Sequence, residues 1–264
     1  MPESTHISAA EKSAVAWPTP ADAVRAIQSG TGKGVRVAII DSGIELDHPA
    51  LNGLKLRDDI AVASDGMRMQ ISEGGGVDVY GHGTAVAALL KKAAPDVEIG
   101  SFRALDNQNH SRNFVIAECA RQAIERGYHI INCSFGSRGL PKYVMDFKEW
   151  VDAAHVAGVH VVAACSNVSA STREWPAHFP EVISVGTASR ECEALELFHR
   201  PGEMVSLAAK GERVEVPWLE KTWRVETGSS FAAPVVAGLA ARILAEYPTM
   251  AKGLLKPLLE AIAE

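Results

Sequence analysis

The sequence has no excess of positive charge. Its 26 Lys and Arg residues are outnumbered by 32 Asp and Glu residues, which leaves a formal net charge of −6. Proteins that bind nucleic acid draw most of their affinity from basic side chains that contact phosphates. The composition therefore argues against nucleic acid as a partner.

Long apolar runs are absent as well. The longest notable run, residues 231–241, ends at Arg242 and is well short of the roughly 20 residues that cross a bilayer. The first twenty residues also lack the basic start and apolar stretch of a secretion signal. We therefore expect no membrane association and a cytoplasmic location.

Cysteine is scarce and its spacing matches no metal site. The four cysteines are separated by 14, 32 and 27 residues, so the sequence has neither a CxxC pair nor a zinc-finger spacing. The glycine-rich segments 30–34 and 81–83 match neither a phosphate-binding loop nor a dinucleotide fingerprint. We expect no metal, no cofactor and buried free thiols in a reducing compartment.

The composition is that of an ordinary globular protein, with 47% apolar and 22% charged residues. Short β-branched runs alternate with helical patterns, which predicts parallel strands joined by helices on both faces of a sheet. The fold class is therefore a three-layer α/β domain with a mostly parallel central sheet. The predicted strands are 34–40, 99–104, 130–134, 160–164 and 182–185, and the predicted helices are 84–93, 113–125, 143–157 and 232–246.

The chain divides into a short arm and one domain. No internal repeat or long linker interrupts the sequence after the first twenty residues. We expect residues 1–20 to form an arm and residues 21–264 to form a single domain. Two hypotheses for the arm stay open: a disordered tail, or a segment that lies near the cleft.

Three polar residues stand in glycine-flanked, otherwise apolar surroundings. Asp41 lies in Asp-Ser-Gly, His82 in Gly-His-Gly-Thr and Ser230 in Gly-Ser-Ser-Phe-Ala-Ala-Pro, with separations of 41 and 148 residues. A serine becomes nucleophilic when an imidazole takes its proton and a carboxylate orients that imidazole. Each residue alone has a simpler interpretation as a turn residue or helix cap, but the three together indicate a catalytic triad.

These motifs resemble those of the subtilisin-like serine proteases, the subtilases. VAIIDSGI resembles the aspartate motif of the family, GHGTAVAAL the histidine motif and GSSFAAPVVAGLAA the serine motif. The resemblance covers almost the whole chain. It implies a serine endopeptidase in which Asp41 orients the base, His82 is the base and then the acid, and Ser230 is the nucleophile.

The resemblance also implies further site residues. Asn167 matches the asparagine that directs its amide toward the oxyanion, although Ser166 stands where the family usually has glycine. Ser134, Phe135 and Gly136 resemble one edge of the groove for an extended peptide substrate, and residues 105–112 would supply the opposite edge. Glu174 matches a position at the floor of the S1 pocket, where a buried carboxylate would favour Lys or Arg at P1; a solvated surface position is the alternative.

A further acid stands four residues before His82. We expect Asp78 to be a solvated loop acid, because carboxylates are mostly exposed. A role in tuning a substrate pocket is the alternative.

The sequence departs from many secreted relatives after the histidine motif. The long loop that helps to bind structural calcium in those relatives is missing, since LLKKAAP leads directly toward the next strand. We therefore expect no strong calcium site of that type. Two other functions stay open: a catalytically silent peptide-binding homologue, and an esterase that uses the same triad. The partner in the leading interpretation is a peptide or protein substrate, and the oligomeric state is not predicted.

Overall fold

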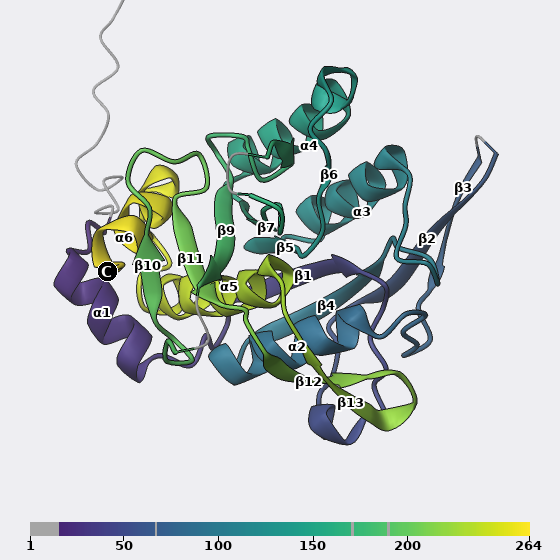
Figure 1. Cartoon of the computed structure of the whole chain (residues 1–264), viewed down its shortest axis with the longest axis horizontal. Coiled ribbons are helices and arrows are strands. Elements are labelled where there is room, and N and C mark those ends of the chain that lie inside the picture. The colour runs from purple at the N-terminus through teal and green to yellow at the C-terminus, as the bar shows by residue number, and fades with distance from the viewer. Residues whose placement is uncertain (1–15, 67, 170–171, 189–190) are drawn as a thin grey trace, which may run out of the picture.

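The computed structural model describes residues 16–264 except residues 67, 170–171 and 189–190. Within these residues a nine-stranded sheet runs through the molecule in the order β10-β11-β9-β7-β5-β1-β4-β2-β3 (Figure 1). The strands from β11 to β2 are parallel, and the edge strands β10 and β3 are antiparallel to their neighbours. The sheet consists of β1 (Arg36–Asp41), β2 (Asp59–Asp65), β3 (Arg68–Glu73), β4 (Glu98–Arg103), β5 (Ile130–Cys133), β7 (His160–Ala164), β9 (Ile183–Ala188), β10 (Leu197–His199) and β11 (Leu207–Lys210).

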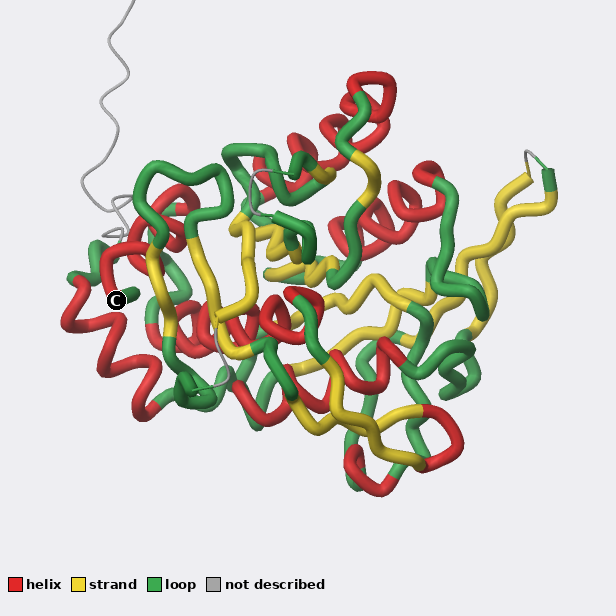
Figure 2. The backbone as a smooth tube through the Cα atoms, in the orientation of Figure 1, coloured by secondary structure: helices red, strands yellow, loops and turns green. Residues whose placement is uncertain are grey.

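Helices cover both faces of this sheet, so the predicted three-layer α/β architecture is confirmed (Figure 2). Alternate residues of β1 point to opposite faces: Val37 and Ile39 pack on one side, and Ala38 and Ile40 on the other. The first side is covered by α1 (Pro20–Ser29), α2 (His82–Ala93), α5 (Ser229–Glu246) and α6 (Leu255–Ile262), and the second by α3 (Asn113–Glu125) and α4 (Val144–Ala157).

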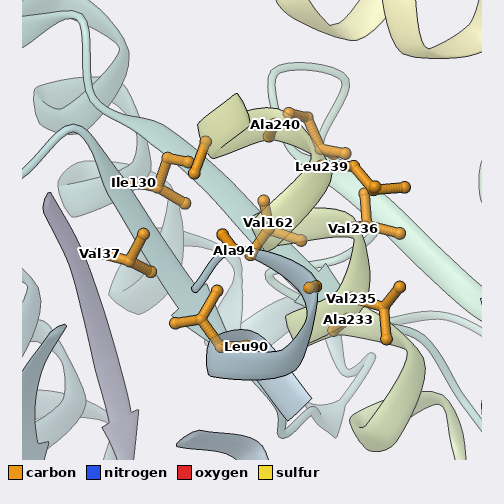
Figure 3. Packing of buried hydrophobic residues seen from close by; sticks show 14 of the residues in the cluster. Val37, Leu90, Ala94, Ile130, Val162, Ala233, Val235, Val236, Leu239 and Ala240 are labelled. Carbon is orange, nitrogen blue, oxygen red and sulfur yellow. The ribbon is translucent and has the colours of Figure 1, made fainter. Parts of the chain in front are cut away.

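Helix α5 is the central helix of the larger core. It is long and apolar enough to cross a membrane, yet 72% of it is buried inside the protein, where it packs against α2 and the sheet (Figure 3). Gly238 allows the close approach of the two helices, because a Cβ at this position would lie 2.5 Å from the Cβ of Ala93. The length of α5 is therefore explained by the core.

The five predicted strands and four predicted helices are all present, with ends that differ by at most a few residues. The sequence analysis missed α1, α6, the antiparallel pair β10–β11 and two hairpins, the β2–β3 pair and the pair β12 (Val214–Trp218) with β13 (Thr222–Glu226). Strand β3 is exposed along its whole length, so it lacks the apolar alternation that identifies a half-buried strand. A small pair, β6 (Ser137–Arg138) with β8 (Glu174–Trp175), joins two loops.

The arm joins the domain far from the carboxyl ends of the strands. Ala16 forms a parallel bridge with Met250, and Thr19 caps α1 through a capping box with Asp22. Met250 follows α5, whose 18 residues span about 27 Å at 1.5 Å per residue. Residues 1–15, on which the prediction of a segment near the cleft depends, lie outside the described residues.

Candidate active site

The last residue of β1 and the first residue of α2 meet at the centre of the sheet edge. Asp41 ends β1 and His82 begins α2, and both side chains are buried. Nδ1 of His82 lies 2.9 Å from Oδ1 and 3.0 Å from Oδ2 of Asp41. Oδ1 also accepts a 2.8 Å hydrogen bond from the backbone N–H of Ser42, which holds the carboxylate in place. With Nδ1–H donated to Asp41, Nε2 of His82 is the nitrogen that can accept a proton.

Burial and nearby carboxylates act in opposite directions on the imidazole. Burial alone would lower the pKa of His82, but the charge of Asp41, its hydrogen bond, and the more distant charges of Asp78 and Glu226 outweigh that effect. The net result is a pKa raised above its usual 6.5. A base with a raised pKa binds a proton more strongly, which suits a group that must take one from a hydroxyl.

Asp78 holds the loop that presents His82. Its Oδ1 accepts hydrogen bonds from the N–H groups of Tyr80 and Gly81 and from the Ser42 hydroxyl, at 2.7–2.9 Å. Its Oδ2 accepts from the N–H and the hydroxyl of Thr84, at 2.8 and 2.6 Å. The N-cap residue of α2 is Gly81, which has no side chain to accept hydrogen bonds from the first turn. Asp78 accepts them instead. The expectation of a solvated loop acid was wrong, because these donors all converge on one buried carboxylate.

The two adjacent serines at the start of α5 have different surroundings. Ser229 is buried: its hydroxyl donates to the Cys165 carbonyl at 2.5 Å and its N–H donates to Oδ1 of Asn167 at 2.8 Å. Ser230 is only partly buried and lies in the first turn of the helix. Unpaired N–H groups and the helix dipole favour negative charge at that end of a helix. Ser229 is thus engaged with the fold, which leaves Ser230 as the accessible hydroxyl.

Gly228 shows how closely Asn167 and Ser230 approach one another. A Cβ added at Gly228 would lie 3.3 Å from both Nδ2 of Asn167 and Oγ of Ser230. Both groups therefore border the same small space. Because Oδ1 of Asn167 is held by Ser229, the amide presents its Nδ2 donor to that space. The structure thus brings Asn167 close to Ser230, as it brings Asp41 close to His82.

The predicted substrate residues lie beside this cluster. Ser134, Phe135 and Gly136 follow β5, and the β6–β8 pair joins them to Glu174 through the pairing of Arg138 with Glu174. The Glu174 carboxylate packs over the Cα of Gly136, since a Cβ there would collide with Oε2. Glu174 is half-buried, and burial raises its pKa despite a hydrogen bond with Ser166 that lowers it. It does not occupy the fully solvated surface position that was the alternative.

The opposite edge begins where β4 ends. The N–H groups of Ala104 and Leu105 both donate to the carbonyl of Asp41, at 2.9 and 3.1 Å. Asp106 then closes a turn by accepting from the N–H groups of Gln108 and His110 at 2.9 Å. Since β1 lies between β4 and β5, the two edges flank the strand that carries Asp41.

Two contacts of this site were not found from the sequence. Trp218, at the end of β12, lies edge-on to the His82 ring, and Asp78 caps the His82 loop. Trp218 follows an alternating Val-Glu-Val pattern that could have indicated a strand, but no local signal identifies the helix it packs against.

Comparison with known proteins places almost the whole chain in one family. The family model of the subtilases matches residues 32–263. Subtilisin DY from Bacillus licheniformis is 31% identical over 243 residues, which cover 87% of this chain and 83% of the relative. Subtilisin E from Bacillus subtilis is 31% identical over 246 residues, which cover 89% of this chain and 62% of the relative.

Solved structures agree with the fold. A cold-adapted subtilisin-like serine proteinase superposes with a TM-score of 0.71 at 23% identity, and the match covers 88% of this chain and 83% of that one. A psychrophilic protease, S41, superposes with a TM-score of 0.74, also at 23% identity and with the same coverage.

Proposed function

Because the chain belongs to the subtilase family of serine endopeptidases, we propose that Asp41, His82 and Ser230 are its catalytic triad. The observation that carries the proposal is the buried hydrogen bond between Asp41 and His82, two residues 41 positions apart. The His82 ring also contacts Phe231, the residue after Ser230 in the first turn of α5. Ser230 would attack the acyl carbon of the substrate while Nε2 of His82 takes its proton. The Asp41 carboxylate would stabilise the imidazolium that results.

The negative charge of the tetrahedral intermediate needs donors that are already in place. Nδ2 of Asn167 and the backbone N–H of Ser230 are the proposed pair, supported by the orientation that Ser229 imposes on Asn167. His82 would then protonate the leaving amine and activate a water molecule that hydrolyses the acyl-enzyme. The products are two shorter peptides, and the triad returns to its starting state.

Substrate selection would begin at the backbone. An extended peptide adds a strand to Ser134, Phe135 and Gly136 on one side and to residues 105–112 on the other, so main-chain hydrogen bonds supply affinity and pockets supply specificity. We propose that the protein processes a particular peptide or precursor. The half-buried Glu174 carboxylate beside Gly136 supports a preference for Lys or Arg at P1.

Peptides that differ only at P1 test this preference. Arg or Lys at P1 should be cleaved faster than Leu, and Glu174→Gln should remove the difference. Glu191→Gln, at an exposed position after β9, is the matched control. Equal cleavage of the Arg and Leu peptides by the wild-type protein would refute the proposal for Glu174 and leave the triad untouched.

A fluorophosphonate probe tests the triad and one of its alternatives together. The probe should label wild-type protein at Ser230 and leave Ser230→Ala unlabelled, whereas a catalytically silent peptide-binding protein would not react. Rates on a matched amide and ester then distinguish the peptidase from an esterase. Peptide cleavage that persists in Ser230→Ala would rule out Ser230 as the nucleophile.

The cytoplasmic location also stays a proposal. All four cysteines lie in the described part of the chain and are buried thiols. Such thiols are compatible with a reducing compartment. Fractionation of the source cells with an antibody to the protein tests it, and recovery in the culture medium would contradict it.

A further inference from the structure

A cavity borders Asn167, and its other lining residues have no part in the proposed mechanism. It has a volume of about 240 Å³ and opens at the carboxyl ends of β7 and β9. Its polar lining includes Ser166, Thr187, Thr227 and the guanidinium group of Arg200. The cavity therefore joins a cationic side chain to the place where the scissile carbonyl would bind.

The order of the strands indicates which part of a substrate reaches this cavity. Strand β7, which leads to Asn167, lies between β5 and β9. Ser134, Phe135 and Gly136 follow β5, so the acyl part of an extended peptide lies on that side. A peptide that continues in the same direction past the scissile bond crosses β7 toward the end of β9, where Thr187 and Arg200 line the cavity. This path puts the cavity on the leaving-group side.

Arg200 is held in this cavity while its charge remains largely uncompensated. Its Nη2 donates to the carbonyl of Thr187 at 3.0 Å, a neutral partner. The carboxylate paired with it, Glu203, is 4.0 Å away and about half exposed, which makes that ion pair weak. Gly186 leaves room for the guanidinium, because a Cβ there would lie 3.1 Å from Nη1.

The thiol of Cys165 lines the cavity and interacts electrostatically with both Arg200 and Glu174. Burial raises the pKa of Cys165 to about 11; the charge of Arg200 lowers this pKa and the charge of Glu174 raises it. The site thus has a carboxylate near the proposed P1 position and a guanidinium near the leaving group. Such a charge pattern is complementary to a substrate with a cation before the scissile bond and an anion after it.

We propose that this cavity is a leaving-group subsite for a carboxylate, bound by Arg200. The proposal rests on the proposed peptidase function and adds a substrate class to it. Guanidinium and carboxylate form paired, charge-assisted hydrogen bonds, so the site discriminates a carboxylate from its amide. The carboxylate can come from an acidic side chain at P1′ or P2′ or from the free carboxyl end of a peptide.

Matched peptides with Asp or Asn at P1′ or P2′ test the subsite. Wild-type protein should cleave the preferred Asp peptide with a kcat/KM about tenfold above that of the Asn peptide, since charged hydrogen bonds contribute this much or more. Arg200→Gln should bring the ratio near one, and Arg200→Lys should restore part of it. Arg57→Gln, which breaks an exposed ion pair with Glu98, is the control and should retain the wild-type ratio.

Short peptides that end one or two residues after the scissile bond distinguish the two sources. Preference for a free carboxyl end over its amide assigns the terminal carboxylate, and preference for Asp within a longer peptide assigns a side chain. Wild-type protein that prefers neither carboxylate overturns the proposal, as does a preference that survives in Arg200→Gln. The first of these two results is measured on wild-type protein, so it does not depend on the folding of a variant.

The experiments also distinguish failure of the carboxylate subsite from failure of the proposed peptidase function. If the Asn peptides are cleaved and no carboxylate preference is found, only the subsite is refuted. If wild-type protein cleaves none of the peptides and does not react with the fluorophosphonate probe, the peptidase function itself is refuted.

Discussion

The indole of Trp218 stands edge-on to the imidazole of His82, with ring centroids 6.4 Å apart and planes at 82°. Trp218 is 5% exposed. The guanidinium of Arg224, on the other strand of the hairpin, lies 4.7 Å from the centroid of the Trp218 ring. Phe231 contacts the same imidazole at 5.4 Å. The β12–β13 hairpin thereby excludes water from one side of His82.

Removing the Trp218 indole should move the acid limb of the pH profile of kcat/KM to higher pH. Burial is the largest influence on the pKa of His82 and it lowers that pKa, so Trp218→Ala should raise it. His82 must be neutral to act as a base, and the acid limb of kcat/KM should therefore move to higher pH. The truncation should also reduce the free energy of unfolding by about 3 kcal/mol.

The matched control is Trp223→Ala on the same hairpin. Trp223 is 53% exposed and contacts His48, so the change should leave the acid limb in place. Trp218→Phe should lie between wild type and Trp218→Ala. An unchanged pH profile in Trp218→Ala would show that the indole does not shield the imidazole.

Neutralising Asp78 should move the acid limb of kcat/KM to lower pH, opposite to the shift expected for Trp218→Ala. The charge of Asp78 raises the pKa of His82, so Asp78→Asn should lower it and extend activity to lower pH. The variant should also lose about 2 kcal/mol of stability, because an amide cannot accept all of the hydrogen bonds that the carboxylate accepts. Asp65→Asn, at an exposed position on β2, is the control. A limb that moves upward in Asp78→Asn would contradict this account.

Removing the Asn167 amide should affect turnover more than binding. Asn167→Ala is expected to reduce kcat by about 10²- to 10³-fold with little change in KM, which is the range established for such a donor in subtilisin. The expected split arises because the oxyanion forms only as the reaction proceeds. Asn113→Ala, at the start of α3, serves as the control. Near-normal kcat in Asn167→Ala would remove Asn167 from the proposed site.

Chelation should leave thermal stability unchanged. Helix α2 ends at Ala93 and β4 begins at Glu98, so the connection between them is short. Across the described part of the chain, no group of three or more His, Cys, Asp or Glu side chains is arranged to hold a metal ion. The midpoint of thermal unfolding should be the same with calcium and with EDTA. A lower midpoint in EDTA would reveal a calcium site elsewhere.

The sequence alone was sufficient for the features that depend on neighbouring residues. The β-branched run before Asp41 and the helical period after His82 place these two residues at the ends of regular elements, and the predicted helix 232–246 places Ser230 next to a helix start. Apolar periodicity also predicted the alternation of strands and helices, because each element must bury one face.

Only the tertiary structure decided which distant groups touch these residues. Four contacts join segments whose local sequence patterns do not identify one another. They are the hydrogen bonds to the buried Asp78, the hydrogen bond from Ser229 to Cys165, the Trp218 contact with His82 and the approach of Glu174 to Gly136. No sequence pattern distinguishes Arg200 from the other arginines. The sheet places β9 beside β7, and Arg200 then lines the cavity next to Asn167. Local preferences act over a few residues, whereas these partners are selected by the packing of the whole sheet.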